Sequence, residues 1–169
     1  MATKWNLDPT HSEITFKVRH MMISNVKGSF TNFSAELEAE DDTFKNVNVK
    51  TTIQTDSVST HNADRDNHLK SEDFFNVAAN PEITFESSAL NNEITGNLTL
   101  NGVTKPIELD VDFGGINVDP WGNTKAGFSF EGKISRKDFG LNWNAALETG
   151  GVMVSDEVKI AGELQFVKA

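Results

Sequence analysis

Strict alternation of apolar and polar residues recurs along almost the whole chain and constrains the fold more than any other feature. In Glu13–His20, for example, Ile14, Phe16 and Val18 alternate with charged or hydroxyl side chains. A period of two sends successive side chains to opposite faces of a β-strand, so that one face is buried and the other meets solvent. We therefore expect a protein built from half-buried strands.

Eight segments carry this alternation, and the turns between them favour antiparallel pairing. Tight turns are expected at Asn91-Asn92 and at Asn101-Gly102, where the second pair tolerates the positive φ of a type I′ turn. No long helix and no strand–helix–strand spacing is present, so we predict a closed or nearly closed antiparallel barrel, with a β-sandwich as the alternative. The expected strands are Glu13–His20, Phe30–Glu40 with a bulge near Thr31-Asn32, Val47–Thr55, Ile83–Ser87, Ile94–Leu100, Ile107–Phe113, Phe128–Ile134 and Val158–Phe166.

The segment Asn62–Phe85 interrupts the alternation with polar and charged residues, followed by the apolar pair Phe74-Phe75. A short helix is expected over Ala63–Leu69, with the Asn62 side chain as its N-cap. Gly114-Gly115 and the residues after them are expected to form a longer loop. The chain is thus predicted to be all-β with one short helical insertion.

Composition limits the classes of function. With 169 residues and no linker, the chain is expected to form a single domain over residues 1–169. Its net charge of −10 repels phosphate backbones, so no nucleic-acid partner is expected. Without an apolar run long enough for a signal peptide or a membrane span, we expect a cytoplasmic protein with no stable membrane insertion. The absence of cysteine excludes disulfides and thiolate chemistry.

The polar residues near the insertion have two interpretations each. The four histidines lack the spacing of metal ligands, so neither a metal nor another cofactor is expected. His20 lies on the dry face of its strand, either as a core histidine bonded to a backbone carbonyl or as a polar group at a pocket mouth. Arg65 and Lys70 are either surface charges or, beside Phe74 and Phe75, groups that hold an anionic head at the rim.

Six segments, taken in order, resemble the YceI-like family of lipid-binding barrels. They are Trp5–Ser12 (WNLDPTHS), Phe16–Met21 (FKVRHM), Arg65–Phe75 (RDNHLKSEDFF), Pro81–Phe85 (PEITF), Gly96–Pro106 (GNLTLNGVTKP) and Ser135–Leu141 (SRKDFGL). The similar region extends from about Trp5 to Phe166. The resemblance implies an extended, lipocalin-like, eight-stranded antiparallel barrel whose long apolar interior holds a polyisoprenoid or another long-chain amphipathic lipid. The resemblance also implies that many relatives carry a secretion signal, whereas none is expected here.

The leading hypothesis is therefore a protein without enzymatic activity that binds such a lipid, for transport or storage. His20, Arg65 and Lys70 are the candidates for the lipid head, and Phe74, Phe75 and Trp143 are the candidates for a cover or entrance. The dry-face residues expected to form the wall are Phe16, Val18, Ile53, Phe85, Leu98, Leu109, Val111, Phe128, Phe130, Ile160 and Leu164. Inward glycines at positions 96, 132 and 162 leave space or let the wall bend.

Two other hypotheses belong to different classes of protein. One is an enzyme acting on a small amphiphile, with His20 or His68 as general base beside a carboxylate such as Asp66. The other is a barrel filled by its own side chains, whose outer face binds a protein. A homodimer also stays open, because an exposed sheet edge or the aromatic insertion can pair with a second copy.

Overall fold

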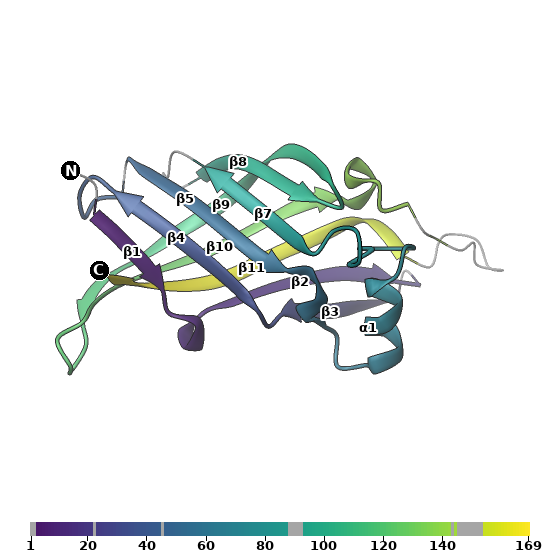
Figure 1. Cartoon of the computed structure of the whole chain (residues 1–169), viewed down its shortest axis with the longest axis horizontal. Helices are drawn as coiled ribbons and strands as arrows, with labels where there is room; N and C mark the ends of the chain where they lie inside the picture. The colour runs from purple at the N-terminus through teal and green to yellow at the C-terminus, as the bar shows by residue number, and fades with distance from the viewer. Residues whose placement is uncertain (1–2, 22, 45, 88–92, 143, 145–153) are drawn as a thin grey trace.

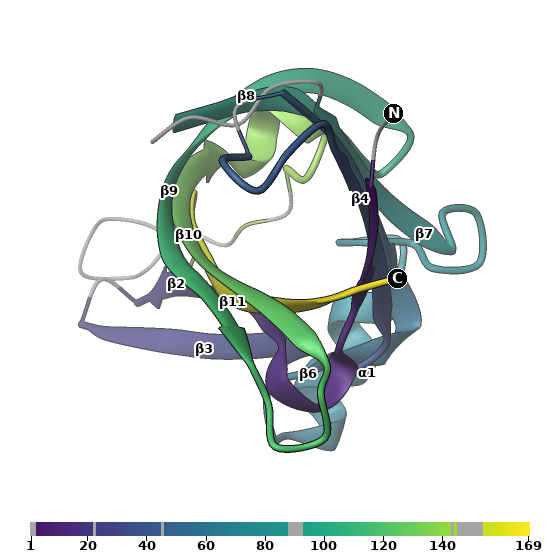
Figure 2. The same cartoon turned by 90° about the vertical axis from the view of Figure 1, so that its left-hand side faces the viewer.

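The described residues form one antiparallel sheet that closes into a barrel. The computed structural model describes residues 3–21, 23–44, 46–87, 93–142, 144 and 154–169. Within them the strand order is β1-β4-β5-β7-β8-β9-β10-β11-β2-β3-β6, with an additional pairing of β1 and β11. Since β1 pairs with both β4 and β11, eight strands close around an axis, as Figure 2 shows, and β2, β3 and β6 extend the sheet beyond the barrel.

The elements differ greatly in length, and the longest strands lie next to one another in β9, β10 and β11. The strands are β1 (Thr3–Leu7), β2 (Glu13–His20), β3 (Ser24–Phe30), β4 (Phe33–Ala39), β5 (Val47–Gln54), β6 (Val58–Ser59), β7 (Glu82–Ser87), β8 (Glu93–Leu100), β9 (Val103–Val118), β10 (Thr124–Ser135) and β11 (Val154–Lys168). The helix α1 spans Ala63–Lys70, and 3₁₀ turns span Pro9–His11, Thr55–Ser57 and Arg136–Phe139. No helix among the described residues is long and apolar enough to cross a bilayer.

Two local predictions from the sequence are confirmed. Helix α1 begins after Asn62, whose side-chain oxygen accepts a hydrogen bond from the Arg65 backbone N–H at 3.0 Å. Asn101 and Gly102 join β8 to β9 with φ values of 54° and 73°, as a type I′ turn requires. The turn expected at Asn91-Asn92 lies outside the described residues.

The prediction of one bulged strand over Phe30–Glu40 is wrong. Ser24–Phe30 is a separate strand, β3, which pairs with β2 and ends on Phe30, while β4 begins at Phe33 and pairs with β1 and β5. Phe30 appeared out of phase because it belongs to a different strand, and it is buried there opposite Ile14. The chain leaves the barrel in β2 and β3 and re-enters it in β4.

The long loop expected around Gly114-Gly115 is also shorter than predicted. β9 continues through both glycines to Val118, and the register with β10 shifts where Gly127 faces Gly115 and Phe128 faces Phe113. Gly114 is therefore the extra residue of a β-bulge, which bends the strand without ending it. Only Asp119–Asn123 remain as a turn between β9 and β10.

A sharp corner at Asp8 lets two strands share one edge of β11. β1 pairs with β11 around Phe166, and β2 pairs with the same strand from Glu163 back to Val154. Between them the Asp8 carboxylate accepts hydrogen bonds from the Thr10 backbone N–H and from Lys125 Nζ on β10, at 3.1 and 3.0 Å. The corner turns β1 toward β4, which closes the barrel, and lets β2 continue past it.

Replacing Asp8 with asparagine is expected to lower the free energy of unfolding at neutral pH by about 1–2 kcal/mol, because charge-assisted hydrogen bonds are lost. Partial burial raises the pKa of the Asp8 carboxyl, but hydrogen bonds from Thr10, Lys125 and His11 outweigh it and hold that pKa well below 3.8. A folded-state pKa below the unfolded one stabilises the protein above the unfolded value. The difference between Asp8→Asn and wild type should thus be constant at neutral pH and shrink progressively below about pH 4.

Urea unfolding at a series of pH values measures this difference. Asp112→Asn removes a carboxylate from the exposed outer face of β9 and should change stability by less than about 0.5 kcal/mol. Equal effects of the two substitutions at neutral pH would contradict a structural role for Asp8.

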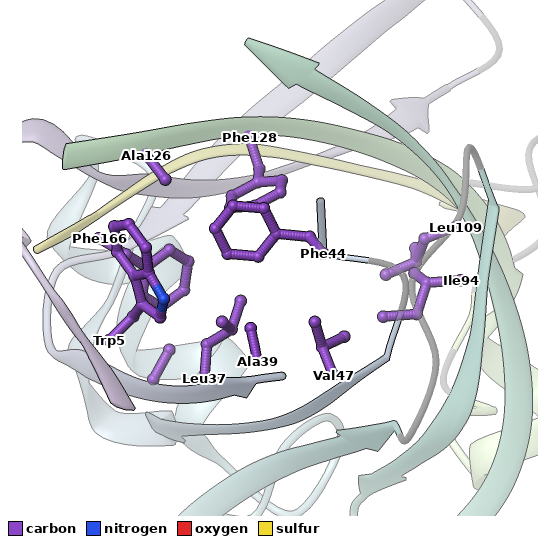
Figure 3. Packing of buried hydrophobic residues seen from close by; sticks show 11 residues of the cluster. Trp5, Leu37, Ala39, Phe44, Val47, Ile94, Leu109, Ala126, Phe128 and Phe166 are labelled. Carbon is purple, nitrogen blue, oxygen red and sulfur yellow. The ribbon is translucent and has the colours of Figure 1, made fainter. Parts of the chain in front are cut away.

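One end of the barrel is plugged by an aromatic cluster. The Asp41 side chain accepts a hydrogen bond from the Thr43 backbone N–H at 2.8 Å, and this tight turn between β4 and β5 turns Phe44 inward with φ of 56°. The Phe44 ring lies 5.3 Å from Trp5 and 5.1 Å from Phe128, as measured between ring centroids, and is 2% exposed. Figure 3 shows it pointing across the barrel from the β4–β5 turn. The alternation in the sequence did not predict this plug.

Candidate functional site

An apolar cavity of about 330 Å³ occupies the barrel between the Phe44 plug and helix α1. Its lining comes from strands all around the barrel and from the insertion after β6. At the plug end the lining residues Leu37 and Phe166 are buried, whereas at the α1 end the lining residues Arg19 and Arg65 are exposed. The cavity therefore reaches the surface at the α1 end, which lies away from both termini (Figure 1).

The inward side chains show that the interior is not filled. Val18, Ile160 and Leu164 all line the cavity, yet each is only half-buried. An apolar side chain at the centre of a packed core is normally fully buried and contacts other side chains on every side. These residues instead keep part of their apolar surface facing open space, which rules out the alternative of a completely filled barrel.

Glycines make room for this space by letting aromatic rings lie along the wall. A Cβ at Gly162 would come within 2.4 Å of the Phe130 ring, and one at Gly96 within 2.5 Å of the Phe85 ring. Phe130 faces Gly162 directly across β10 and β11. Each ring thus covers a glycine backbone, leaving the centre of the barrel free.

The cavity is elongated. Val154 and Phe166 both line it and stand at opposite ends of the same strand, β11. The separation of twelve residues corresponds to about 40 Å along the strand, at about 3.3 Å per residue. With strands tilted by about 40° to the barrel axis, this is roughly 30 Å along the axis. A shape of this kind fits an extended chain better than a compact ligand.

Helix α1 is fastened beside the cavity by a polar cluster centred on Thr60. The Thr60 backbone N–H and hydroxyl both donate to the Asp66 carboxylate, at 2.8 and 2.5 Å. Arg65 donates from Nε to the Thr60 hydroxyl and from Nη2 to the Thr60 carbonyl, at 2.8 and 2.7 Å. These bonds fix the first turn of the helix, so that Arg65, His68 and Leu69 all line the cavity from one face of α1.

A buried arginine closes the other side of this end. The Arg136 side chain is 3% exposed and donates to the carbonyls of Leu141, Ser155 and Val154 at 2.6, 2.9 and 3.3 Å. Burial lowers its pKa, an effect opposed by Asp156, whose carboxylate lies 3.8 Å from Nη2. Arginine nevertheless stays charged at any ordinary pH, so Arg136 is a fixed positive charge in the cavity wall.

All ionisable groups among the described lining residues are basic or imidazole side chains. They are Arg19, His20, Arg65, His68 and Arg136, and no aspartate or glutamate is among them. We call these five the mouth residues. Asp73 and Asp156 contact two of them from outside the lining, so the side that faces the cavity carries basic groups without carboxylates, which favours an anionic group at the α1 end.

Most of the residues predicted from the sequence lie around this cavity. The predicted residues that line it are Phe16, Val18, His20, Ile53, Arg65, Phe74, Phe75, Phe85, Leu98, Leu109, Val111, Phe128, Phe130, Ile160 and Leu164. Lys70 does not line it, because it follows Leu69 on the helix and successive helical residues point about 100° apart. Trp143 lies outside the described residues.

The structure gives Asp66 and the histidines other partners than the hypothesis of a histidine base beside Asp66 expected. Asp66 is bound to Thr60, as described above, and the carboxylate beside His68 is that of Asp73, whose Oδ2 lies 2.9 Å from Nε2. His20 has no side-chain hydrogen bond within the part of the chain that the structure describes. Asp73, and not Asp66, is therefore the described carboxylate that lies beside a candidate histidine base.

Sequence reasoning missed Arg136 and Arg19 as lining residues. Arg136 comes directly after the alternating run of β10, where a charged residue indicates an exposed strand end. Arg19 falls on the polar face of β2. Arg136 follows β10 directly, in the run Ser135–Leu141 that carried part of the family resemblance. The position of Arg136 in that run was the one available signal, but nothing in the local sequence distinguishes a buried arginine from a surface arginine.

A closed barrel of eight antiparallel strands around an elongated apolar cavity places the protein in the class of extended, lipocalin-like barrels. Within that class, residues 5–166 match the model of the YceI-like domain, and the chain belongs to this family. The resemblance seen in the sequence is thereby confirmed.

Relatives and solved structures agree with this assignment. A UPF0312 protein of Staphylococcus epidermidis is 41% identical over 166 residues, which cover 97% of both chains. The crystal structure of the Campylobacter jejuni YceI protein is 34% identical, with a TM-score of 0.75 over 89% of this chain and 90% of that one. A polyisoprenoid-binding domain from Saccharophagus degradans has a TM-score of 0.76 over 98% of both chains, at 16% identity, which shows the shared fold.

Proposed function

We propose that this protein binds a polyisoprenoid or another long-chain amphipathic lipid inside the barrel, and that transport or storage of that lipid is its role. The observation that carries the proposal is the elongated, open apolar cavity whose inward side chains remain half-buried. A structural neighbour described as a polyisoprenoid-binding domain supports the same reading. Each buried methylene contributes about 0.8 kcal/mol, so a long chain binds without a strong polar anchor, although immobilisation offsets part of the gain.

The lipid head is proposed to be anionic and to lie among the mouth residues. Arg65 keeps Nε and Nη2 on Thr60, so its guanidinium is held in place with Nη1 left for a ligand. His20 lines the same end and has no other described partner, so it can donate to an anionic oxygen. Arg136 adds positive potential while its N–H groups stay on backbone carbonyls. Thus, Arg65 and His20 are the proposed direct contacts.

Mass spectrometry under native conditions, on protein purified from its host and again after solvent extraction, tests the proposal. A stoichiometric adduct that extracts as a long-chain lipid is the expected result. Protein at its bare mass, unchanged after incubation with prenyl alcohols and long-chain fatty acids, would refute the binding of a lipid in the barrel.

Val18→Trp is expected to weaken the binding of a fluorescent long-chain fatty acid by at least about ten-fold, because the indole takes the space of several methylene groups. Val18 points into the cavity from β2 and has free space before it, so the melting temperature should change by only a few degrees. Displacement titration and a thermal melt measure both quantities.

Val118→Trp is the matched control, since it adds the same indole at a position on β9 that is 58% exposed and outside the cavity. It should leave the affinity unchanged. If both variants bind as wild type does, the fatty acid occupies another part of the protein and the proposed site is wrong.

A further inference from the structure

Four lysines form one row across the outer face of β10, β11, β2 and β3. Lys133 pairs with Lys159, Lys159 with Lys17, and Lys17 with Lys27. Directly paired residues point to the same face of a sheet. Since Ile160 lines the cavity and neighbours Lys159 along β11, the row points outward. We call these four residues the lysine row.

The row works against the stability of the free protein. Like charges directly opposite one another destabilise a sheet. Lys17, Lys27 and Lys159 form no ion pair with any described residue, and Lys133 has only an exposed contact of 3.9 Å with Glu157. Four aligned lysines in a chain of net charge −10 are therefore a feature that an anionic partner would compensate.

An apolar tip adjoins the row. The turn between β2 and β3 exposes Met21 at 40% and Ile23 at 78%. The paired part of the hairpin that carries this tip, Ile14–Phe30, contains two lysines, one arginine and one histidine, and its one acidic neighbour in β2 is Glu13, at the end far from the tip. Figure 1 shows it at the same end of the molecule as α1, where the cavity reaches the surface. Basic and exposed apolar groups thus occur together beside the cavity mouth.

We propose that the lysine row and the exposed tip residues Met21 and Ile23 dock the protein on the surface of an anionic lipid bilayer. The proposal rests on the proposed function, since it brings the open end of a lipid-binding cavity to a membrane. A bilayer offers anionic headgroups with an apolar layer beneath them, which suits a basic face with an apolar tip. A nucleic acid offers the charge without the apolar layer.

The distances fit such a contact. Lys17 and Lys27 each lie four residues from the tip, which is about 13 Å along the strand. With the tip inserted by about 5–10 Å, the row lies within about one Debye length of the headgroups.

Acidic side chains flank the lysine row on the same outer face: Glu157 lies one row nearer the tip, opposite Ser135, while Glu131 and the facing pair Glu163 and Glu13 lie farther from it.

Co-sedimentation with phosphatidylcholine vesicles, with and without about one third phosphatidylglycerol, tests the proposal. Wild-type protein is expected to bind the anionic vesicles at low salt, to release them at about 0.5 M NaCl and to ignore pure phosphatidylcholine. The triple variant K17Q/K27Q/K159Q should partition about a hundred-fold less, at roughly five-fold per lysine. Its melting temperature should be equal or higher by a few degrees, because repulsion across the strands is removed.

Two matched controls separate the docking surface from general effects. K4Q/K50Q/K105Q removes the same charge from exposed positions elsewhere and should keep most of the binding. Ile23→Ser should reduce partitioning about ten-fold, whereas Trp121→Ser should not. Trp121 is 83% exposed and belongs to the turn between β9 and β10, which Figure 1 shows at the end of the molecule opposite to α1. The proposal would be overturned if the two triple lysine variants lost vesicle binding equally, or if Ile23→Ser and Trp121→Ser did. Binding to duplex DNA in place of anionic vesicles would also overturn it.

Fatty-acid displacement in solution without vesicles distinguishes a failure of the docking proposal from a failure of the proposed function. K17Q/K27Q/K159Q should load fatty acid as wild type does. Normal loading without vesicle binding by wild type would overturn docking alone, and vesicle binding without loading would overturn only the interior lipid site.

Discussion

Phe44→Ala is expected to lower the free energy of unfolding by about 3–5 kcal/mol and to lengthen the lipid chain that the barrel accepts. The ring is 2% exposed and contacts Trp5, Phe113 and Phe128, so its loss leaves a void that the surrounding strands cannot close. Phe128 also lines the cavity, and the void therefore continues the cavity toward the end that Phe44 now plugs. Urea unfolding measures the first effect.

The second effect is read from a series of fatty acids or prenyl alcohols of increasing length. In wild type the affinity should rise with each added methylene until the chain reaches the plug, and then level off. In Phe44→Ala the rise should continue for several more carbons, because the stop has been removed.

Phe113→Ala is the control for the stability effect, since Phe113 touches the same ring but is 42% exposed. We expect it to cost about 1 kcal/mol and to leave the length profile unchanged. Equal costs for both alanine variants would show that Phe44 does not hold the end of the barrel together. A wild-type length profile in a destabilised Phe44→Ala variant would place the stop elsewhere.

Arg136→Met is expected to lower the free energy of unfolding by about 3–5 kcal/mol, since three buried carbonyls lose their donors at about 1–3 kcal/mol each. The methionine retains much of the volume but leaves the carbonyls of Leu141, Val154 and Ser155 without their donors in a buried place. These carbonyls belong to the segment after β10 and to the start of β11. The amide protons of both regions should therefore lose protection against hydrogen exchange together. Urea unfolding combined with amide hydrogen exchange at Leu141 and at the first residues of β11 measures the effect.

Lys137→Met is the matched control for a loss of charge. Lys137 is the next residue, is exposed, and pairs with the same Asp156 at 3.4 Å. Its replacement should cost less than about 0.5 kcal/mol. If Arg136→Met is as stable as Lys137→Met, the carbonyls find other donors and Arg136 does not join these segments.

Individual elements show how far local patterns reach. The alternation in β2, β5, β10 and β11 predicted which side chains face inward, and the wall of the cavity follows from it. Asn62 and the Asn101-Gly102 pair predicted a helix start and a hairpin, because a cap and a type I′ turn depend on only a few neighbouring residues. The run Phe30–Glu40 was misassigned because alternation does not reveal where one strand ends and another begins.

The amino-acid sequence by itself determined the half-buried strands, their apolar faces and the single helical insertion, since these depend on the chemistry of residues close together in the chain. The tertiary structure alone decided that Phe44 plugs one end, that Arg136 is buried at the other, and that four lysines from four strands align. The physical reason is that strand register and the path of turns bring together residues far apart in sequence. A period of two specifies the face on which a side chain lies, but not the neighbours it meets there.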